Sequence, residues 1–253
     1  MFTSKYKNYS GNIDANWQDF LKFFAIISMI TDHLGYYFLP EQKILRVIGR
    51  YASVIFCFFV GYNYKRPELG MYFCLDSTRY IKILVLGAIV HLMQIICENI
   101  YGTANILVSI VFNLLLVDIV KNFQINSYLA AIFFATLSFY FCGIVDYNTF
   151  PAALIILGMN RRFDQNKLEY SLCLYFTLIS LMICESKVLD FTLDESFIVC
   201  LIFAFIIFCI KYLDFNTALT AAPYKIFLIS RYSLAIYVLH IISMMTIYYT
   251  NLH

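Results

Sequence analysis

The stretch DFLKFFAIISMITDHLGYYF, residues 19–38, decides the fold of this chain. It is long enough to span the hydrocarbon core of a bilayer, which takes roughly 20 apolar residues. It nevertheless carries Asp19 and Lys22 near its start and the adjacent Asp32 and His33 near its end. The whole chain shares this apolar character, because 62% of its 253 residues are hydrophobic and 13% are charged. This composition is typical of a membrane protein, and we predict one all-α, polytopic helical bundle.

Nine apolar runs are candidate transmembrane helices, and the polar residues 1–18 ahead of them are expected in the cytoplasm. The runs cover residues 19–39, 46–64, 80–98, 104–120, 127–145, 149–160, 170–184, 196–213 and 226–248. The sixth run is the weakest candidate, because at about 1.5 Å per residue it is too short to cross a full bilayer. It is expected to be a half-helix or a re-entrant segment. Residues 19–253 are treated as a single domain.

The Lys and Arg residues orient the bundle. With the N-terminus in the cytoplasm, only Lys43, Arg46, Arg50 and Lys187 of the 18 basic residues fall on the outer side, as the positive-inside rule requires. The net charge of +2 is too small to indicate a nucleic-acid partner. The eight cysteines form no CxxC pair, and lone thiols in apolar runs usually act as small hydrophobic residues. Neither disulfides nor a metal site are predicted.

One face of the first run carries ionisable groups. Because an α-helix turns about 100° per residue, Lys22 and His33 lie on the same face, and Asp19 lies about 40° from His33. Lipid would penalise these groups by several kcal/mol unless their face looks into a protein cavity. Asp19 and Lys22 fit the role of interfacial anchors equally well, and His33 can simply hydrogen-bond a neighbouring helix. The adjacent Asp32 and His33 favour a functional site.

Further candidates lie on other apolar runs. Arg46 and Arg50 are one helical turn apart and face the same way. They either snorkel to the interface or bind a carboxylate, phosphate or oxyanion near the acid and histidine of the first run. His91 and His240 are lone histidines, which more often hydrogen-bond within a core, but the nine-helix arrangement puts both at the level of His33. No GxSxG, P-loop or GxGxxG motif occurs, so hydrolase and nucleotide-binding folds are not indicated.

These residues resemble the TraX family, the conjugative pilin N-acetylases. The resemblance rests on the Asp-x-x-Lys start and Met-x-x-Asp-His end of residues 19–33, and on the Gly49–Arg50 pair. It continues in GTANILVSIVFN, residues 102–113, and in IYVLHII, residues 236–242. The first run is also similar to the broader membrane acyltransferase-3 group, which has Arg where this chain has Lys. The stretch DYNTF, residues 146–150, departs from the family in its Asn, where relatives often have Gly.

The resemblance implies a bacterial inner-membrane enzyme that transfers acetyl from acetyl-CoA to an acceptor amine, in the pilin case the N-terminus of the processed subunit. The chemistry fits His33 as the base, with Asp32 orienting its ring and Arg50 stabilising the oxyanion or holding a CoA phosphate. Adjacent side chains point about 100° apart, so Asp32 touches His33 only if the helix ends or unwinds near Gly35. The residues expected to bind substrate are Asp19, Lys22, Arg46, His91, Asn105 and His240.

Three other functions stay open from the sequence. The first is an O-acyltransferase acting on a surface glycan or lipid, and the second is a transporter or channel lined by His33, His91 and His240. The third is a purely structural membrane subunit.

Acetyl-CoA is cytoplasmic, while His33 is predicted in the outer half of the membrane. Either the acetyl arm threads between the helices or the predicted orientation is inverted. If the acetyl arm threads between the helices, the CoA phosphates could be held by the basic inner residues Lys65, Arg66, Arg79 and Lys82. The topology of the chain alone also explains why these residues are basic.

Overall fold

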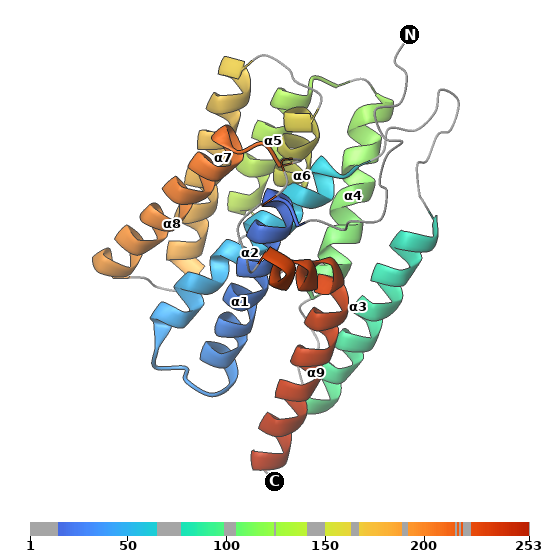
Figure 1. Cartoon of the computed structure of the whole chain (residues 1–253), viewed down its shortest axis with the longest axis vertical. Helices are drawn as coiled ribbons and strands as arrows, with labels where there is room; N and C mark the ends of the chain where they lie inside the picture. The colour runs from blue at the N-terminus through green and yellow to red at the C-terminus, as the bar shows by residue number, and fades with distance from the viewer. Residues whose placement is uncertain are drawn as a thin grey trace.

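The part of the chain that the structure describes is built from helices. The computed structural model describes residues 15–64, 77–98, 105–123, 125–140, 150–162, 167–188, 192–215, 217, 219 and 224–252 (Figure 1). Within these residues lie nine α-helices and one 3₁₀-helix, η1. Their bounds are α1 Trp17–Tyr37, α2 Lys43–Tyr62, α3 Ser77–Glu98, α4 Ile106–Asn122, α5 Ser127–Tyr140, α6 Phe150–Arg162, α7 Lys167–Val188, α8 Leu193–Tyr212, η1 Tyr224–Tyr232 and α9 Ser233–Leu252.

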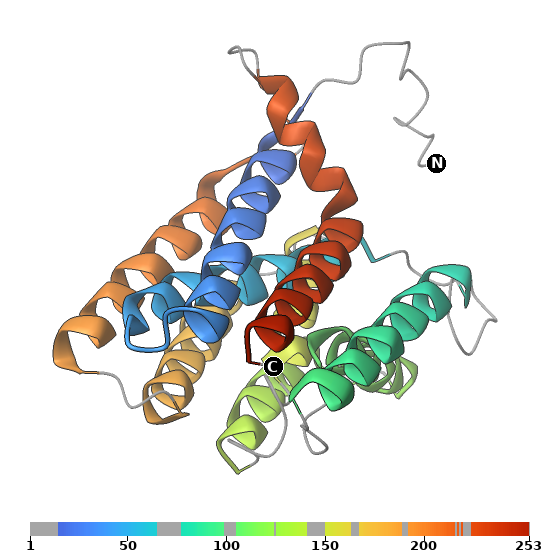
Figure 2. The same ribbon diagram turned by 90° about the horizontal axis from the view of Figure 1, so that it is seen from below.

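The predicted all-α fold is confirmed, and each of the nine apolar runs overlaps one α-helix. The ninth run differs from the prediction at its start, where residues 224–232 form η1 and the α-helix begins only at Ser233. The chain bends between η1 and α9 (Figure 2). Most of the predicted N-terminal segment 1–18 and the departing stretch 146–149 lie outside the described residues.

The helices differ in how well they fit a bilayer. By length and composition, α2 and the segment Ile226–Thr250 are able to cross a membrane. In contrast, α1 contains three charged residues and α6 has only 13 residues. Large apolar side chains are exposed along α3, α8 and α9, including Leu92, Phe197, Leu201, Phe208 and Leu239. Because so many large apolar side chains are unfavourable in contact with water, these features indicate a membrane protein.

The short sixth run forms the centre of the bundle. In α6, residues 150–160 are all buried, and the helix packs against α2, α4, α5 and α7 (Figure 1). A helix that is apolar all round is stable only where protein or lipid covers every side. Since other helices cover α6, its length of 13 residues is explained by its place in the core.

Glycines bring α2 and α6 into close contact. A Cβ atom added to Gly61 would lie 2.8 Å from the Cα atom of Ile155, and one added to Gly158 would lie 2.7 Å from the backbone nitrogen of Tyr62. Real Cβ atoms do not approach backbone so closely, so only glycine permits this separation of the two helices. Small residues serve the same purpose at helix interfaces in membrane proteins.

Hydrogen bonds fix α1 against α2. Asn16 caps α1 through a capping box with Asp19, which satisfies backbone N–H groups of the first turn. The Ser28 hydroxyl donates to the carbonyl of Ile48 at 2.5 Å, and the Tyr51 hydroxyl donates to the carbonyl of Leu21 at 3.3 Å. On its other side α1 packs against η1 and α9. The first helix is therefore held between the second and the last.

The close contact between α2 and α6 predicts that one methyl group added at this contact lowers the stability of the protein. Gly158→Ala is expected to lower the free energy of unfolding by about 1–3 kcal/mol, because the new Cβ meets rigid backbone of α2. Thermal or chemical unfolding in detergent micelles measures the change. Thr246→Ala, on the exposed side of α9, is the control and is expected to stay within about 0.5 kcal/mol of the wild type. Equal stability of both variants would contradict this packing.

Candidate active site

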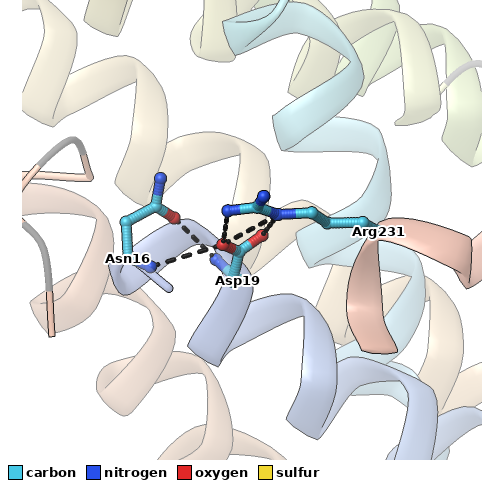
Figure 3. Close-up of polar contacts among 3 residues, drawn as sticks. All are labelled: Asn16, Asp19 and Arg231. Atoms are coloured by element: carbon cyan, nitrogen blue, oxygen red, sulfur yellow. Dashed lines mark hydrogen bonds and ion pairs between the residues drawn. The ribbon is translucent and has the colours of Figure 1, made fainter. Parts of the chain in front are cut away.

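Asp19 forms an ion pair with Arg231 at the start of α1. The carboxylate is buried, and its Oδ2 atom accepts from Nη2 of Arg231 at 2.7 Å and from Nε at 3.2 Å (Figure 3). The second carboxylate oxygen also accepts from Nε at 3.2 Å. Asp19 therefore joins α1 to the last turn of η1, and its carboxylate is already engaged by a charge and by the helix cap.

Lys22 points toward α2. Its ammonium nitrogen lies 5.3 Å from the centre of the Phe59 ring, which is the range of a cation–π interaction. Lys22 and His33 are eleven residues apart, which is about 16 Å along α1, so their predicted common face does not bring their functional groups together, and Lys22 instead reaches α2.

Asp32 is buried and pairs with Arg46. The Nε atom of Arg46 lies 3.0 Å from Oδ1 of Asp32, but the angles do not meet those of a hydrogen bond. The attraction is therefore mainly Coulombic. Gly49 makes the space for this pair, because a Cβ atom there would overlap the Asp32 side chain.

His33 faces α9, where it meets His240. The Nδ1 atom of His33 lies 2.6 Å from Nε2 of His240, and the two ring planes are inclined by 29° with their centres 4.9 Å apart. Nδ1 of His240 lies 2.9 Å from the carbonyl oxygen of Ile236. Tyr237 packs near both imidazoles, with ring centres 6.1 Å from His33 and 5.8 Å from His240. Two of the predicted site residues, from the two ends of the chain, thus form one unit.

The predicted contact between Asp32 and His33 is absent. Helix α1 continues through Gly35 to Tyr37, so the unwinding that this contact requires does not occur. Asp32 instead contacts α2, and His33 contacts α9. The side chain that hydrogen-bonds the His33 ring comes from His240.

Two arginines of α2 contribute positive charge to the surroundings of His33. His33 is within electrostatic range of Arg46 and Arg50 of α2. The side chain of Arg50 is buried, whereas that of Arg46 is 22% exposed and engaged by Asp32. An imidazole and a buried arginine on facing helices can together accept a proton and stabilise a negative oxygen.

Two predicted substrate-binding residues take no part in this cluster. Asn105 caps α4: its Oδ1 atom accepts from the backbone N–H groups of Leu107 and Val108 at 3.0 and 3.3 Å, and its Nδ2 donates to the carbonyl of Gly87 at 2.5 Å. His91 lies on α3 and hydrogen-bonds neither His33 nor His240. Its Nδ1 atom is buried and has no hydrogen-bond partner within the described parts of the chain.

Sequence reasoning missed Arg231 as the partner of Asp19 and treated it only as an inner-side charge. The available signal was its position in the ninth run, where a charge inside an apolar stretch needs a partner. No group of three or more His, Cys, Asp or Glu side chains able to hold a metal ion occurs among the residues that the structure describes.

The fold and the site together define an all-helical membrane protein that gathers ionisable side chains of α1, α2, η1 and α9 inside the bundle. Comparison with protein families then identifies the group. The family model described as "TraX protein" matches residues 17–248, which include every helix of the site, and the chain belongs to the TraX family.

A curated relative is similar over part of the chain. The protein named "Uncharacterized protein RP591" of Rickettsia prowazekii (strain Madrid E) is 31% identical over 170 residues. The match covers 65% of this chain and 63% of that protein, so this chain spans less than two thirds of the relative's length. No solved structure matches.

The ion pair at the start of α1 predicts an energetic coupling between residues 19 and 231. Asp19→Asn and Arg231→Gln are each expected to destabilise the protein, since each leaves the other partner without its counter-charge. The double variant is expected to be less destabilised than the sum of the two single variants, because it leaves neither charge unpaired. The difference is expected to be only about 1–2 kcal/mol, since the Arg231 side chain is 39% exposed and solvent screens the pair. Unfolding measurements on the four proteins give the coupling. Additive effects would contradict a direct interaction.

Proposed function

We propose that the protein is a membrane acetyltransferase that moves an acetyl group from acetyl-CoA to an amine, the N-terminus of a conjugative pilin subunit. Membership of the TraX family links the chain to pilins in conjugation, and the family is associated with their acetylation. The observation that carries the proposal is the position of His33, with an imidazole on one side and the guanidinium of Arg50 within electrostatic range.

The proposed reaction uses His33 as the base. The amine nitrogen attacks the thioester carbonyl carbon, an N–C bond forms, and the nitrogen loses a proton to Nε2 of His33. The tetrahedral intermediate then collapses, the C–S bond breaks, and His33 returns the proton to the departing thiolate. The products are the acetylated amine and free CoA, and the histidine ends in its starting state.

Of the two roles open for Arg50, oxyanion stabilisation is the better supported. The phosphates of CoA lie at the far end of the pantetheine arm from the thioester. A guanidinium within electrostatic range of His33 is therefore expected nearer to the thioester carbonyl than to the phosphates. Its buried position strengthens its effect on the developing oxyanion, because nearby water is scarce.

We further propose that the nine helices lie in the bacterial inner membrane with the N-terminus in the cytoplasm. The support is the basic inner loops and the apolar side chains exposed on α3, α8 and α9. Lys82 is exposed on α3 and is available to a CoA phosphate. Lys65, Arg66 and the Arg79 side chain lie outside the described residues.

The proposal predicts that His33→Ala abolishes acetylation without loss of the fold. The test is intact-mass spectrometry of a processed conjugative pilin subunit co-expressed with each protein. The wild type is expected to give an N-terminal acetyl group and His33→Ala none, because the base is gone. Ser243→Ala, an exposed position on α9, is the control with wild-type activity. Full acetylation with folded His33→Ala would rule out His33 as the base.

The same experiment separates the remaining functions. An acetylated glycan or lipid beside an unmodified pilin would move the acceptor to a hydroxyl group and overturn the amine. Proton-coupled uptake into proteoliposomes without any acetyl transfer would overturn the enzyme altogether.

The role of Arg50 predicts a change in turnover. Arg50→Gln is expected to lower kcat by about 10²–10³-fold, as removal of an oxyanion donor does, with KM for acetyl-CoA nearly unchanged. Steady-state kinetics in detergent micelles with a pilin N-terminal peptide measure both constants. A raised KM with unchanged kcat would instead assign Arg50 to binding of the CoA phosphates.

A further inference from the structure

The two imidazoles of His33 and His240 share one proton. Their facing nitrogens, Nδ1 of His33 and Nε2 of His240, are 2.6 Å apart, so one of them must donate and the other must accept. If both carried hydrogens they would clash, and if neither did their lone pairs would repel. The positions of the remaining protons follow from the other contacts of the two rings.

The contact of His240 with the backbone decides its tautomer. Nδ1 of His240 lies 2.9 Å from the carbonyl oxygen of Ile236, and a carbonyl oxygen only accepts. The proton of a neutral His240 therefore sits on Nδ1, and its Nε2 is an acceptor. His33 must then donate from Nδ1, which leaves Nε2 of a neutral His33 without a proton.

We propose that His240 is a positioning residue that fixes His33 in the tautomer with an unprotonated Nε2. The backbone carbonyl of Ile236 sets His240, and His240 in turn sets His33. The inference rests on the proposed function for its purpose, since Nε2 is the atom that takes the proton from the attacking amine.

The surroundings suit this role. The rings of Tyr37 and Tyr237 lie near the His33 ring, with centres 6.4 and 6.1 Å away, and Arg46 and Arg50 of α2 are within its electrostatic range. His33 makes no hydrogen bond through Nε2 to any part of the chain that the structure describes. A pair of histidines that served only to satisfy each other in the core would have no reason to keep this atom available.

The pair also accommodates the charge of the protonated state. When Nε2 of His33 gains a proton, the pair holds one extra proton in total, and the hydrogen between the rings is able to shift from Nδ1 of His33 toward Nε2 of His240. The positive charge is then spread over two rings, without a buried carboxylate beside the base.

The first test is nitrogen NMR of the full-length protein, labelled at histidine and placed in lipid nanodiscs. The chain has only four histidines, so single substitutions assign their signals. For His33 we expect a protonated Nδ1 and an unprotonated Nε2. His240→Ala is expected to redistribute the proton between the two His33 nitrogens, whereas Ser243→Ala leaves both signals in place. A wild-type His33 with its proton on Nε2 would overturn the inference.

The second test compares two replacements of His240 in the pilin acetylation assay. His240→Ala is expected to slow acetylation by about 10²-fold, because part of the His33 population adopts the wrong tautomer. His240→Gln places an amide oxygen near the former Nε2 and is expected to recover most of the activity. Equal losses in both variants, with both folded by thermal unfolding, would overturn the positioning role.

The two tests separate the inference from the function on which it rests. If the expected His33 tautomer is present in a protein that acetylates nothing, the proposed function fails and the role of His240 in setting the tautomer stands. If the wild type acetylates pilin while its His33 carries the proton on Nε2, the function stands and the inference fails.

Discussion

The constraint that governs this structure is the cost of burying ionisable groups in an apolar bundle, which is several kcal/mol for each group without a partner. Helix α1 meets this cost by giving each ionisable side chain a different partner. Asp19 is matched by Arg231, Lys22 by the ring of Phe59, Asp32 by Arg46 and His33 by His240. Because these partners come from α2, η1 and α9, the same pairs that satisfy α1 also hold the second and last helices against it.

Close packing at glycine connects this network to the core. Gly49 leaves room for the Asp32 side chain, and Gly35 lets the end of α1 approach Leu45 of α2, where an added Cβ would lie 2.8 Å from the Leu45 Cβ. The glycines of α2 and α6 continue this contact into the buried centre of the bundle. The position of Arg50 on α2 therefore depends on backbone separations that larger residues would not allow, and the arrangement of the candidate site follows from the packing of α2.

The helices were predictable from the sequence, whereas most of the pairings were not. Apolar runs of sufficient length produced all nine α-helices, because hydrophobic continuity is a local property of the chain. The bend at η1 and the cap formed by Asn105 were missed, since both depend on polar contacts of single side chains. The ion pair of Asp19 with Arg231 joins residues 212 positions apart, and the hydrogen bond between His33 and His240 joins residues 207 positions apart. Helical spacing says which face a residue occupies, but only the packing of helices decides which residue it meets.

The separation of Asp32 from His33 gives the site a different electrostatic character from the expected acid–histidine pair. A carboxylate against the imidazole would add a negative charge beside the position where the oxyanion develops, and would weaken the field of Arg50 there. In the proposed reaction, Arg46 counters the charge of Asp32, a neutral imidazole takes the place of a carboxylate beside the base, and the buried Arg50 acts on the reacting carbonyl. Under the proposed function, the histidine pair therefore orients the base without placing a negative charge near the oxyanion.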